Sequence, residues 1–161
     1  GRFAFKTFGL IPSGYERVMA VCQWVYANIE YIPGSTNASS SACDVLLQRA
    51  GVCRDFSHLS IALCRALGIP ARYLAVYAPG LESPADFHGV FEAYLENRWY
   101  LFDATRMAPV ASFVRIGSGR DATDASFANI VGVATLQSIE VSAIDTTLYD
   151  APSQNLAISI G

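Results

Sequence analysis

The cysteines and histidines of this 161-residue chain are its strongest candidates for covalent chemistry. Cys53 follows Gly51 and begins an apolar-periodic stretch that runs to Leu67, so its thiol is expected in the first turn of a helix. Unpaired backbone N–H groups and the helix dipole favour negative charge there. The Cys53 N–H can also face the oxygen of an attacked carbonyl. The position therefore predicts a nucleophilic thiolate.

A nucleophilic thiolate needs an imidazole as its partner and an acid or amide to orient that imidazole. His58 lies five residues further along the same helix, which rotates it by about 140° from Cys53. We interpret His58 as a polar-face or interior histidine. His88 and Asp103 begin and end a predicted hairpin and are expected at one end of a sheet. The predicted catalytic residues are Cys53, His88 and Asp103, although the residues alone leave a chance combination open.

The hairpin register decides whether Asp103 can reach His88. An even-length loop places both residues on the same face of the sheet. A two-residue turn at Asn97-Arg98 would set Asp103 opposite Glu92, ~13 Å along the strand from His88. The loop must therefore centre near Leu95-Glu96, or a bulge must shift the pairing. Otherwise Glu92, on the same face of the sheet, competes with Asp103 as the carboxylate that orients His88.

Helical patterns dominate the first half of the chain. Three helices are expected, over residues 13–29, 41–51 and 53–67. Ser13 and Glu16 form a capping box for the first helix, and Ser41 is the predicted N-cap of the second. The third ends at Gly68-Ile69-Pro70, because glycine after the last turn and a following proline terminate helices.

Strand-like patterns follow the helices, at residues 72–77, 90–95, 99–102, 113–116 and 133–144. The glycine- and aspartate-rich segment 117–124 separates the last two. Helices first and strands afterwards indicate an α+β fold. We expect one domain over residues 1–161, with a core at about 13–132 and C-terminal strands or a tail over 133–161. The end of the chain, from Tyr149, is either a terminal strand or a loose tail.

Composition excludes several classes of protein. Hydrophobic residues make up 52% of the chain and the formal net charge is -3, so the basic excess that holds a protein to nucleic acid is lacking. Apolar runs such as residues 59–63 are far shorter than the roughly 20 residues of a membrane helix. We expect a soluble protein, slightly favour the cytoplasm, and leave the oligomeric state open. Because the chain begins at Gly1 without methionine, we interpret it as processed or as part of a longer protein.

The remaining polar and aromatic residues point to neither metal nor cofactor. The cysteines lack C-x-x-C spacing, and Cys22 and Cys64 are expected to be buried thiols. Asp121 and Asp124 lack the glycine and glutamate of a calcium loop and are interpreted as an acidic turn. Asp55 is expected to complement the helix dipole. Aromatic residues expected in the core or lining a groove are Trp24, Trp99 and Tyr100.

Two runs of residues resemble the transglutaminase-like superfamily: GVCRDFSHLSIALCRALGIPARYLAVY (51–77) and HGVFEAYLENRWYLFDAT (88–105). The resemblance extends over about residues 15–131, and segment 119–132 is similar to the tail of bacterial cysteine peptidase members. It implies a papain-like α+β fold. It also implies that Cys53 is the nucleophile, His88 the general base and acid, and Asp103 the residue that orients His88.

The family resemblance has two departures. Val90 stands two positions after His88, where members often have an aromatic residue, which affects the wall of the acyl pocket. Little sequence precedes the first helix, whereas many bacterial relatives have β-rich sequence there.

The implied function is acyl transfer or hydrolysis at an amide of a peptide or protein substrate (a peptide bond, an isopeptide bond or a glutamine side chain), through a cysteine thioester. The second oxyanion donor stays open among Gln48, Asn37 and Tyr31. Protease and transglutaminase activity are not separated, although we favour hydrolysis of a peptide or isopeptide bond, since water needs no second substrate site. The alternative is a non-catalytic peptide-binding or scaffolding module on the same fold.

Overall fold

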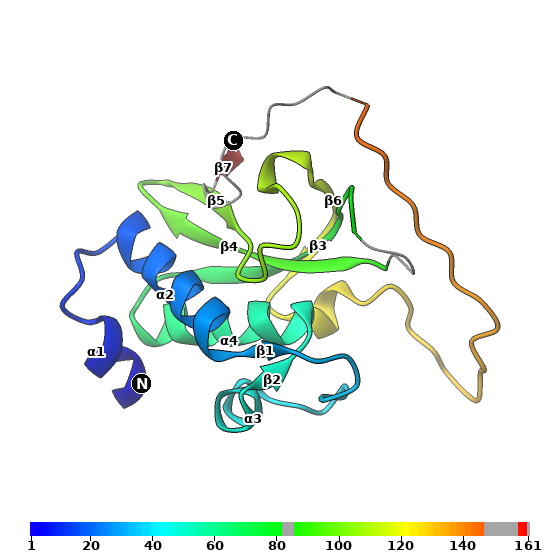
Figure 1. Cartoon of the computed structure of the whole chain (residues 1–161), viewed down its shortest axis with the longest axis horizontal. Helices are drawn as coiled ribbons and strands as arrows, with labels where there is room; N and C mark the ends of the chain where they lie inside the picture. The colour runs from blue at the N-terminus through cyan, green and yellow to red at the C-terminus, as the bar shows by residue number, and fades with distance from the viewer. Residues whose placement is uncertain (82–85, 147–157, 161) are drawn as a thin grey trace.

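Helices and an antiparallel sheet form the two layers of the molecule (Figure 1). The computed structural model describes residues 1–81, 86–146 and 158–160. The helices among them are α1 (Arg2–Phe8), α2 (Tyr15–Asn28), α3 (Ala42–Gln48) and α4 (Cys53–Ala66). The α+β prediction is confirmed, with α4 packed against strands β3 and β4 of the sheet.

The helix starts agree only partly with the predicted caps. Ser41 caps α3 as predicted: its hydroxyl accepts from the Asp44 N–H at 3.3 Å, and the Asp44 carboxylate accepts from the Ser41 N–H at 2.8 Å. The predicted Ser13 cap is wrong, because Gly14 occupies the N-cap of α2 with φ 102° and makes no side-chain capping bond. Helix α1 has no counterpart among the predicted elements.

The main sheet has the order β6-β3-β4-β5-β7, and its paired neighbours are all antiparallel. Its strands are β3 (Ala71–Tyr77), β4 (His88–Leu95), β5 (Arg98–Phe102), β6 (Val114–Gly119) and β7 (Ile158–Ile160). A separate parallel pair, β1 (Glu30–Tyr31) with β2 (Ala50–Gly51), precedes α4 and was not predicted. This pair brings the chain after α2 beside the chain that enters α4.

Strand β4 lies between β3 and β5, and both of its faces are buried. Phe91 and Ala93 belong to the main core, which also contains α4 residues such as Leu59. Val90 belongs to a second cluster with Leu74 on the opposite face. Because side chains alternate along a strand, His88 and Glu92 share the face of Val90. A strand packed on both sides gives His88 a firmly held backbone.

The C-terminal third departs most from the predicted pattern. Strand β6 begins one residue later than the predicted strand over 113–116 and continues to Gly119, into the segment expected to be a loop. Short 3-10 turns cover Val110–Ser112 (η1) and Ala122–Ala125 (η2). Of the chain end from Tyr149, only β7 falls within the described residues, and it pairs with β5.

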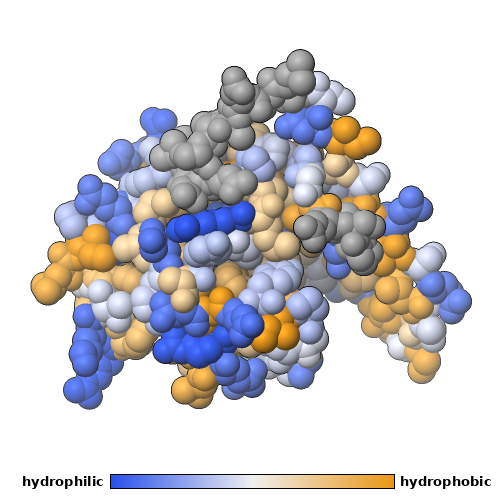
Figure 2. Space-filling view, in the orientation of Figure 1, coloured by the Kyte–Doolittle hydropathy of each residue, from blue (hydrophilic) through white to orange (hydrophobic). Residues whose placement is uncertain are grey.

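The predicted strand over 133–144 is wrong. These residues have no helix or strand assignment and run away from the two layers (Figure 1). Exposed apolar side chains, including Val133, Leu136 and Ile144, lie along this extended stretch, part of which appears at the right of Figure 2. Branched side chains favour an extended backbone, but a strand also needs a hydrogen-bonded neighbour.

Candidate active site

Cys53 is the first residue of α4, as the sequence predicts, and its side chain is half-buried. Asp55 fixes this helix start, since its carboxylate accepts from the Val52 N–H at 2.9 Å. Gly51 lies against the same side chain, and a Cβ there would stand 2.7 Å from the Asp55 Cβ. Glycine is thus required where the chain turns toward Cys53.

A polar network ties the preceding loop to the same helix start. The Arg54 guanidinium donates to the Asp55 carboxylate and to the Thr36 hydroxyl, both at 3.1 Å, and to the Asn37 carbonyl at 3.1 Å. Thr36 in turn donates to the other oxygen of Asp55. Asp55 is almost fully buried, so its charge is balanced by Arg54 and by these donors. Its role as a helix-start residue agrees with the expectation from sequence.

His88 and Asp103 are brought together as predicted. The distance between His88 Nε2 and Asp103 Oδ2 is 3.0 Å, and both side chains are buried. Thr105 holds the second carboxylate oxygen, donating from its hydroxyl at 2.7 Å and from its N–H at 2.8 Å. Sequence reasoning missed Thr105, although a threonine two residues after an aspartate is a recognisable local hydrogen-bonding pattern.

The hairpin register differs from both predicted alternatives. The two-residue turn is Glu96-Asn97, with φ 48° and 68°, as a tight hairpin turn requires. Leu95 pairs with Arg98, and Phe91 pairs with Phe102. Continuing this register would put Asp103 opposite Val90, one diagonal step from His88. Cross-strand diagonal neighbours are within side-chain reach, so neither a turn at Leu95-Glu96 nor a bulge is needed. The shared face predicted from the even loop length is confirmed.

Glu92, the competing carboxylate, is engaged elsewhere. Its fully buried carboxylate forms ion pairs with Arg72 and Arg115. The Arg72 guanidinium also lies 4.0 Å from the ring centroid of Trp99. Glu92 is therefore a structural residue in the sheet, and Asp103 is the carboxylate bonded to His88.

The pKa of His88 depends on its contacts with Asp103 and Cys53. Burial lowers the pKa of the imidazole, but hydrogen bonds with Asp103 and Cys53 outweigh burial and raise the pKa to about 10. Because Asp103 occupies Nε2, Nδ1 is the nitrogen left for the thiol. This arrangement favours a protonated His88 beside Cys53.

Gly89 allows β4 to approach the start of α4. A Cβ on this residue would lie 3.2 Å from the Arg54 backbone nitrogen and would overlap the Tyr73 hydroxyl. The Ser57 hydroxyl donates to the Gly89 carbonyl at 2.8 Å, a bond that joins helix to strand. Close helix–strand contact at this point sets the separation of Cys53 and His88.

The other candidates lie outside this cluster. His58 is half-buried on α4. Cys22 and Cys64 are buried free thiols, and burial raises the pKa of both, that of Cys64 to about 12. Asp124 pairs with Arg120, and the Asp121 carboxylate accepts from Thr123.

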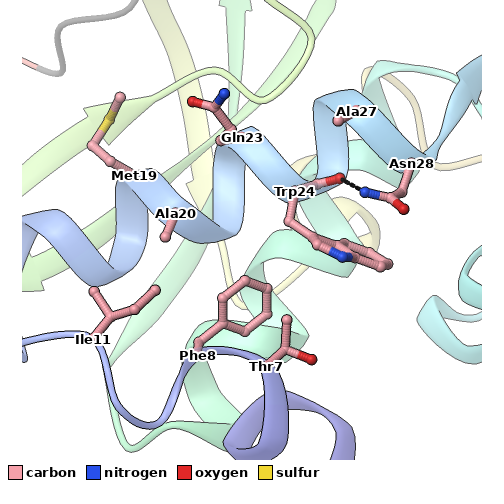
Figure 3. Close-up of a pocket in the computed structure, with 9 residues that line it drawn as sticks. All are labelled: Thr7, Phe8, Ile11, Met19, Ala20, Gln23, Trp24, Ala27 and Asn28. Carbon is pink, nitrogen blue, oxygen red and sulfur yellow. Dashed lines mark hydrogen bonds between the residues drawn. The ribbon is translucent and has the colours of Figure 1, made fainter.

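Trp24 lines an apolar hollow between α1 and α2 together with Phe8, Ile11 and Met19 (Figure 3). None of the three predicted catalytic residues lines this hollow. Over the described part of the chain, no group of three or more His, Cys, Asp and Glu side chains could hold a metal ion, and no helix is long and apolar enough to cross a membrane.

Residues 2–104 match the family described as the transglutaminase-like superfamily, and the chain belongs to this family. An uncharacterised protein of Mycobacterium leprae is 33% identical over 117 residues, which are 68% of this chain and 42% of that protein. The chain thus spans less than half the length of this relative.

Solved structures agree with the family assignment. A protein called "Putative Cysteine Protease" from Cytophaga hutchinsonii is 54% identical, with a TM-score of 0.81 over 83% of this chain and 46% of that chain. The periplasmic domain of TgpA from Pseudomonas aeruginosa is 26% identical, with a TM-score of 0.52 over 66% of this chain and 41% of that one. The transglutaminase-like, papain-like fold is therefore confirmed, and the family supports a cysteine-dependent function at amides in general terms.

Proposed function

We propose that this chain is a cysteine-dependent enzyme that acts on an amide of a peptide or protein through a thioester on Cys53. The observation that carries the proposal is the 3.0 Å contact between His88 Nε2 and Asp103 Oδ2, which leaves Nδ1 for the thiol at the start of α4. A match to the Cytophaga hutchinsonii protein supports the same chemistry.

In the proposed first step, His88 takes the thiol proton and the Cys53 thiolate attacks the amide carbon. A C–S bond forms and the carbonyl electron pair moves to oxygen, where the Cys53 N–H faces it. The C–N bond then breaks, and the protonated His88 gives its proton to the departing amine or ammonia. Asp103 keeps the imidazole oriented throughout.

In the proposed second step, neutral His88 removes a proton from water or from an acceptor amine, which attacks the thioester. The C–S bond breaks and the thiolate is regenerated. We propose water as the acceptor and a peptide or isopeptide bond as the substrate, because hydrolysis requires no second substrate site.

The test uses a glutamine-containing peptide that also has an internal lysine, incubated with a fluorescent primary amine. Mass spectrometry separates amine incorporation, deamidation and backbone cleavage. Hydrolytic products without incorporation are expected, and incorporation as the main product would replace hydrolase by transglutaminase.

Two cysteine variants make the assay specific. Cys53→Ala should abolish every product, whereas Cys43→Ala, at the exposed cysteine of α3, should leave activity unchanged. Because the peptide is only a general substrate, thiol reactivity provides a second measurement. If Cys53 also reacts no faster than an ordinary exposed thiol, the chain is a binding module and the enzymatic proposal is wrong.

A further inference from the structure

Tyr31 lies directly beside the start of α4. It belongs to β1 and pairs with Gly51 of β2, two residues before Cys53. Its ring centroid is 5.9 Å from that of Phe56, one turn further along α4. The phenol is thus held from two sides, by strand pairing and by ring contact.

The phenol hydroxyl contacts Cys53 through two groups. Hydrogen bonding to the Cys53 backbone lowers the pKa of the phenol and hydrogen bonding to the Cys53 side chain raises it, so the Cys53 N–H donates to the phenol oxygen when no substrate is bound. Tyr31 is 40% exposed and Cys53 is half-buried, so the two meet where a substrate can approach. A carbonyl oxygen that enters between the Cys53 N–H and the phenol would accept from both donors.

The other two candidates for this donor are placed less favourably. Gln48 is the last residue of α3 and its side chain is exposed. The Asn37 side-chain oxygen accepts from the Ser39 N–H at 2.8 Å, and its carbonyl accepts from Arg54.

We infer that the Tyr31 hydroxyl is the second oxyanion donor and acts together with the Cys53 N–H. This role rests on the proposed function, because an oxyanion forms only if Cys53 attacks a carbonyl. The phenol must keep its proton to donate. Burial, followed by the nearby Cys53, raises the pKa of Tyr31 to about 12, so the proton is retained at neutral pH.

The test compares two reagents that differ in one respect. p-Nitrophenyl acetate acylates a thiolate through attack on a carbonyl, with negative charge developing on oxygen before p-nitrophenolate leaves. Iodoacetamide alkylates the same thiolate by displacing iodide, and no oxyanion forms. A donor to the oxyanion should therefore affect the first reaction alone.

Tyr31→Phe removes only the hydroxyl. Acylation of Cys53 by p-nitrophenyl acetate should slow by about 10–100-fold, at or below the effect of losing one oxyanion donor in well-studied hydrolases, while alkylation stays within about twofold of wild type. Tyr94→Phe is the matched control. Tyr94 is similarly exposed, at 37%, and lies six residues along β4 from His88, about 20 Å away; neither rate should change.

Three results would overturn the role of Tyr31. Equal slowing of both reagents in Tyr31→Phe would mean that the phenol acts on the thiol instead of the oxyanion. An unchanged acylation rate, with a reactive wild type, would exclude Tyr31 and leave the proposed function intact. A wild-type protein whose Cys53 resists p-nitrophenyl acetate would overturn the proposed function and the role of Tyr31 together.

Discussion

Asp103 holds His88 through Nε2, at 3.0 Å, while Thr105 binds the other oxygen of the same carboxylate. Both carboxylate oxygens of Asp103 are therefore hydrogen-bonded. The imidazole is held in an orientation in which Nδ1 is the nitrogen that can bond the Cys53 thiol. Substitutions at Asp103 and at Thr105 test how much each of these two residues contributes to the proposed reaction.

Asp103→Asn keeps the shape of the carboxylate but loses its charge and the acceptor that fixes the His88 tautomer. We expect turnover to fall by about 10²–10⁴-fold. Thr105→Val should cost less, about 2–10-fold, because the Asp103 oxygen keeps the Thr105 N–H as a donor. Steady-state rates with any hydrolysed peptide or ester test this order; a larger loss in Thr105→Val than in Asp103→Asn would contradict it.

His88 should titrate far above the pH range that is usual for a histidine. Its pKa is raised to about 10, against an ordinary value of about 6.5. Two-dimensional NMR of the imidazole groups follows both histidines, and His58→Gln assigns the remaining signal. In Cys53→Ala the pKa of His88 should fall, since one of the hydrogen bonds that raises it is lost. A His88 signal that titrates near pH 6.5 in wild type would show that the ion pair is absent.

The same pKa has a consequence for folding stability. A histidine whose pKa is higher in the folded state stabilises the fold fully below about pH 6.5, the unfolded value. This contribution is lost as the pH rises through about 10. Denaturant unfolding of wild type and His88→Gln between pH 6 and pH 10.5 measures it. The stability difference between them should shift in favour of the variant as the pH rises, and a constant difference would contradict the raised pKa.

Cys53 should react with iodoacetamide selectively at pH 6. A protonated His88 beside the thiol should favour the reactive thiolate form, whereas Cys22 and Cys64 are buried and their pKa values are raised. Peptide mapping after brief labelling should find the label at Cys53. His88→Ala should reduce the rate at least tenfold. The exposed Cys43 serves as an internal reference, and equal labelling of Cys43 and Cys53 would exclude activation.

Gly89→Ala tests the contact between β4 and α4. The new methyl group would overlap the Tyr73 hydroxyl and lie 3.2 Å from the Arg54 backbone nitrogen, so the Tyr73 side chain must shift and the start of α4 must move away by a few tenths of an ångström. Overpacking of this kind costs ~1–3 kcal/mol, and the wider gap should weaken the Cys53–His88 pair. We expect slower alkylation of Cys53 at pH 6 in a protein that still folds. Gly117→Ala is the control, because a Cβ there meets no atom within 4 Å.

Glu92→Gln should lower the free energy of unfolding while leaving turnover nearly unchanged. Removing this buried charge leaves Arg72 and Arg115 without their partner; we expect a loss of ~1–3 kcal/mol, less than for a fully buried pair because both guanidinium groups are partly exposed. Turnover below the melting temperature should stay within about threefold of wild type. A loss as large as that of Asp103→Asn, in a folded protein, would assign Glu92 a part in the reaction.

Much of the site could be predicted because its signals are local. The start of α4 at Cys53 and the cap at Ser41 could be predicted from the residues next to them in the sequence. The shared face of His88 and Asp103 needed only the even length of the hairpin loop. That all 161 residues form one domain stays a prediction, as do the catalytic roles of Cys53, His88 and Asp103.

The features that could not be predicted depend on pairing between distant segments. The parallel pair of Tyr31 with Gly51 joins residues twenty positions apart through two residues each, too few for a strand pattern. The exact turn, Glu96-Asn97, requires positive φ at two residues that are not glycine, so composition did not mark it. The predicted strand at 133–144 failed for the opposite reason: its composition was suitable, but among the described residues no strand pairs with that stretch.

The short pair of β1 and β2 holds Tyr31 in a different way from the other residues of the candidate site. Cys53 and His88 are held by the packing of α4 on a strand that is covered on both faces, whereas Tyr31 is held by a two-residue ladder and by its ring contact with Phe56. Because Tyr31 is 40% exposed, its exchange by mutation should disturb the hydrophobic core less than the exchange of a buried residue of α4 or β4. The residue that we propose as an oxyanion donor can therefore vary during evolution while the backbone that holds Cys53 and His88 is kept.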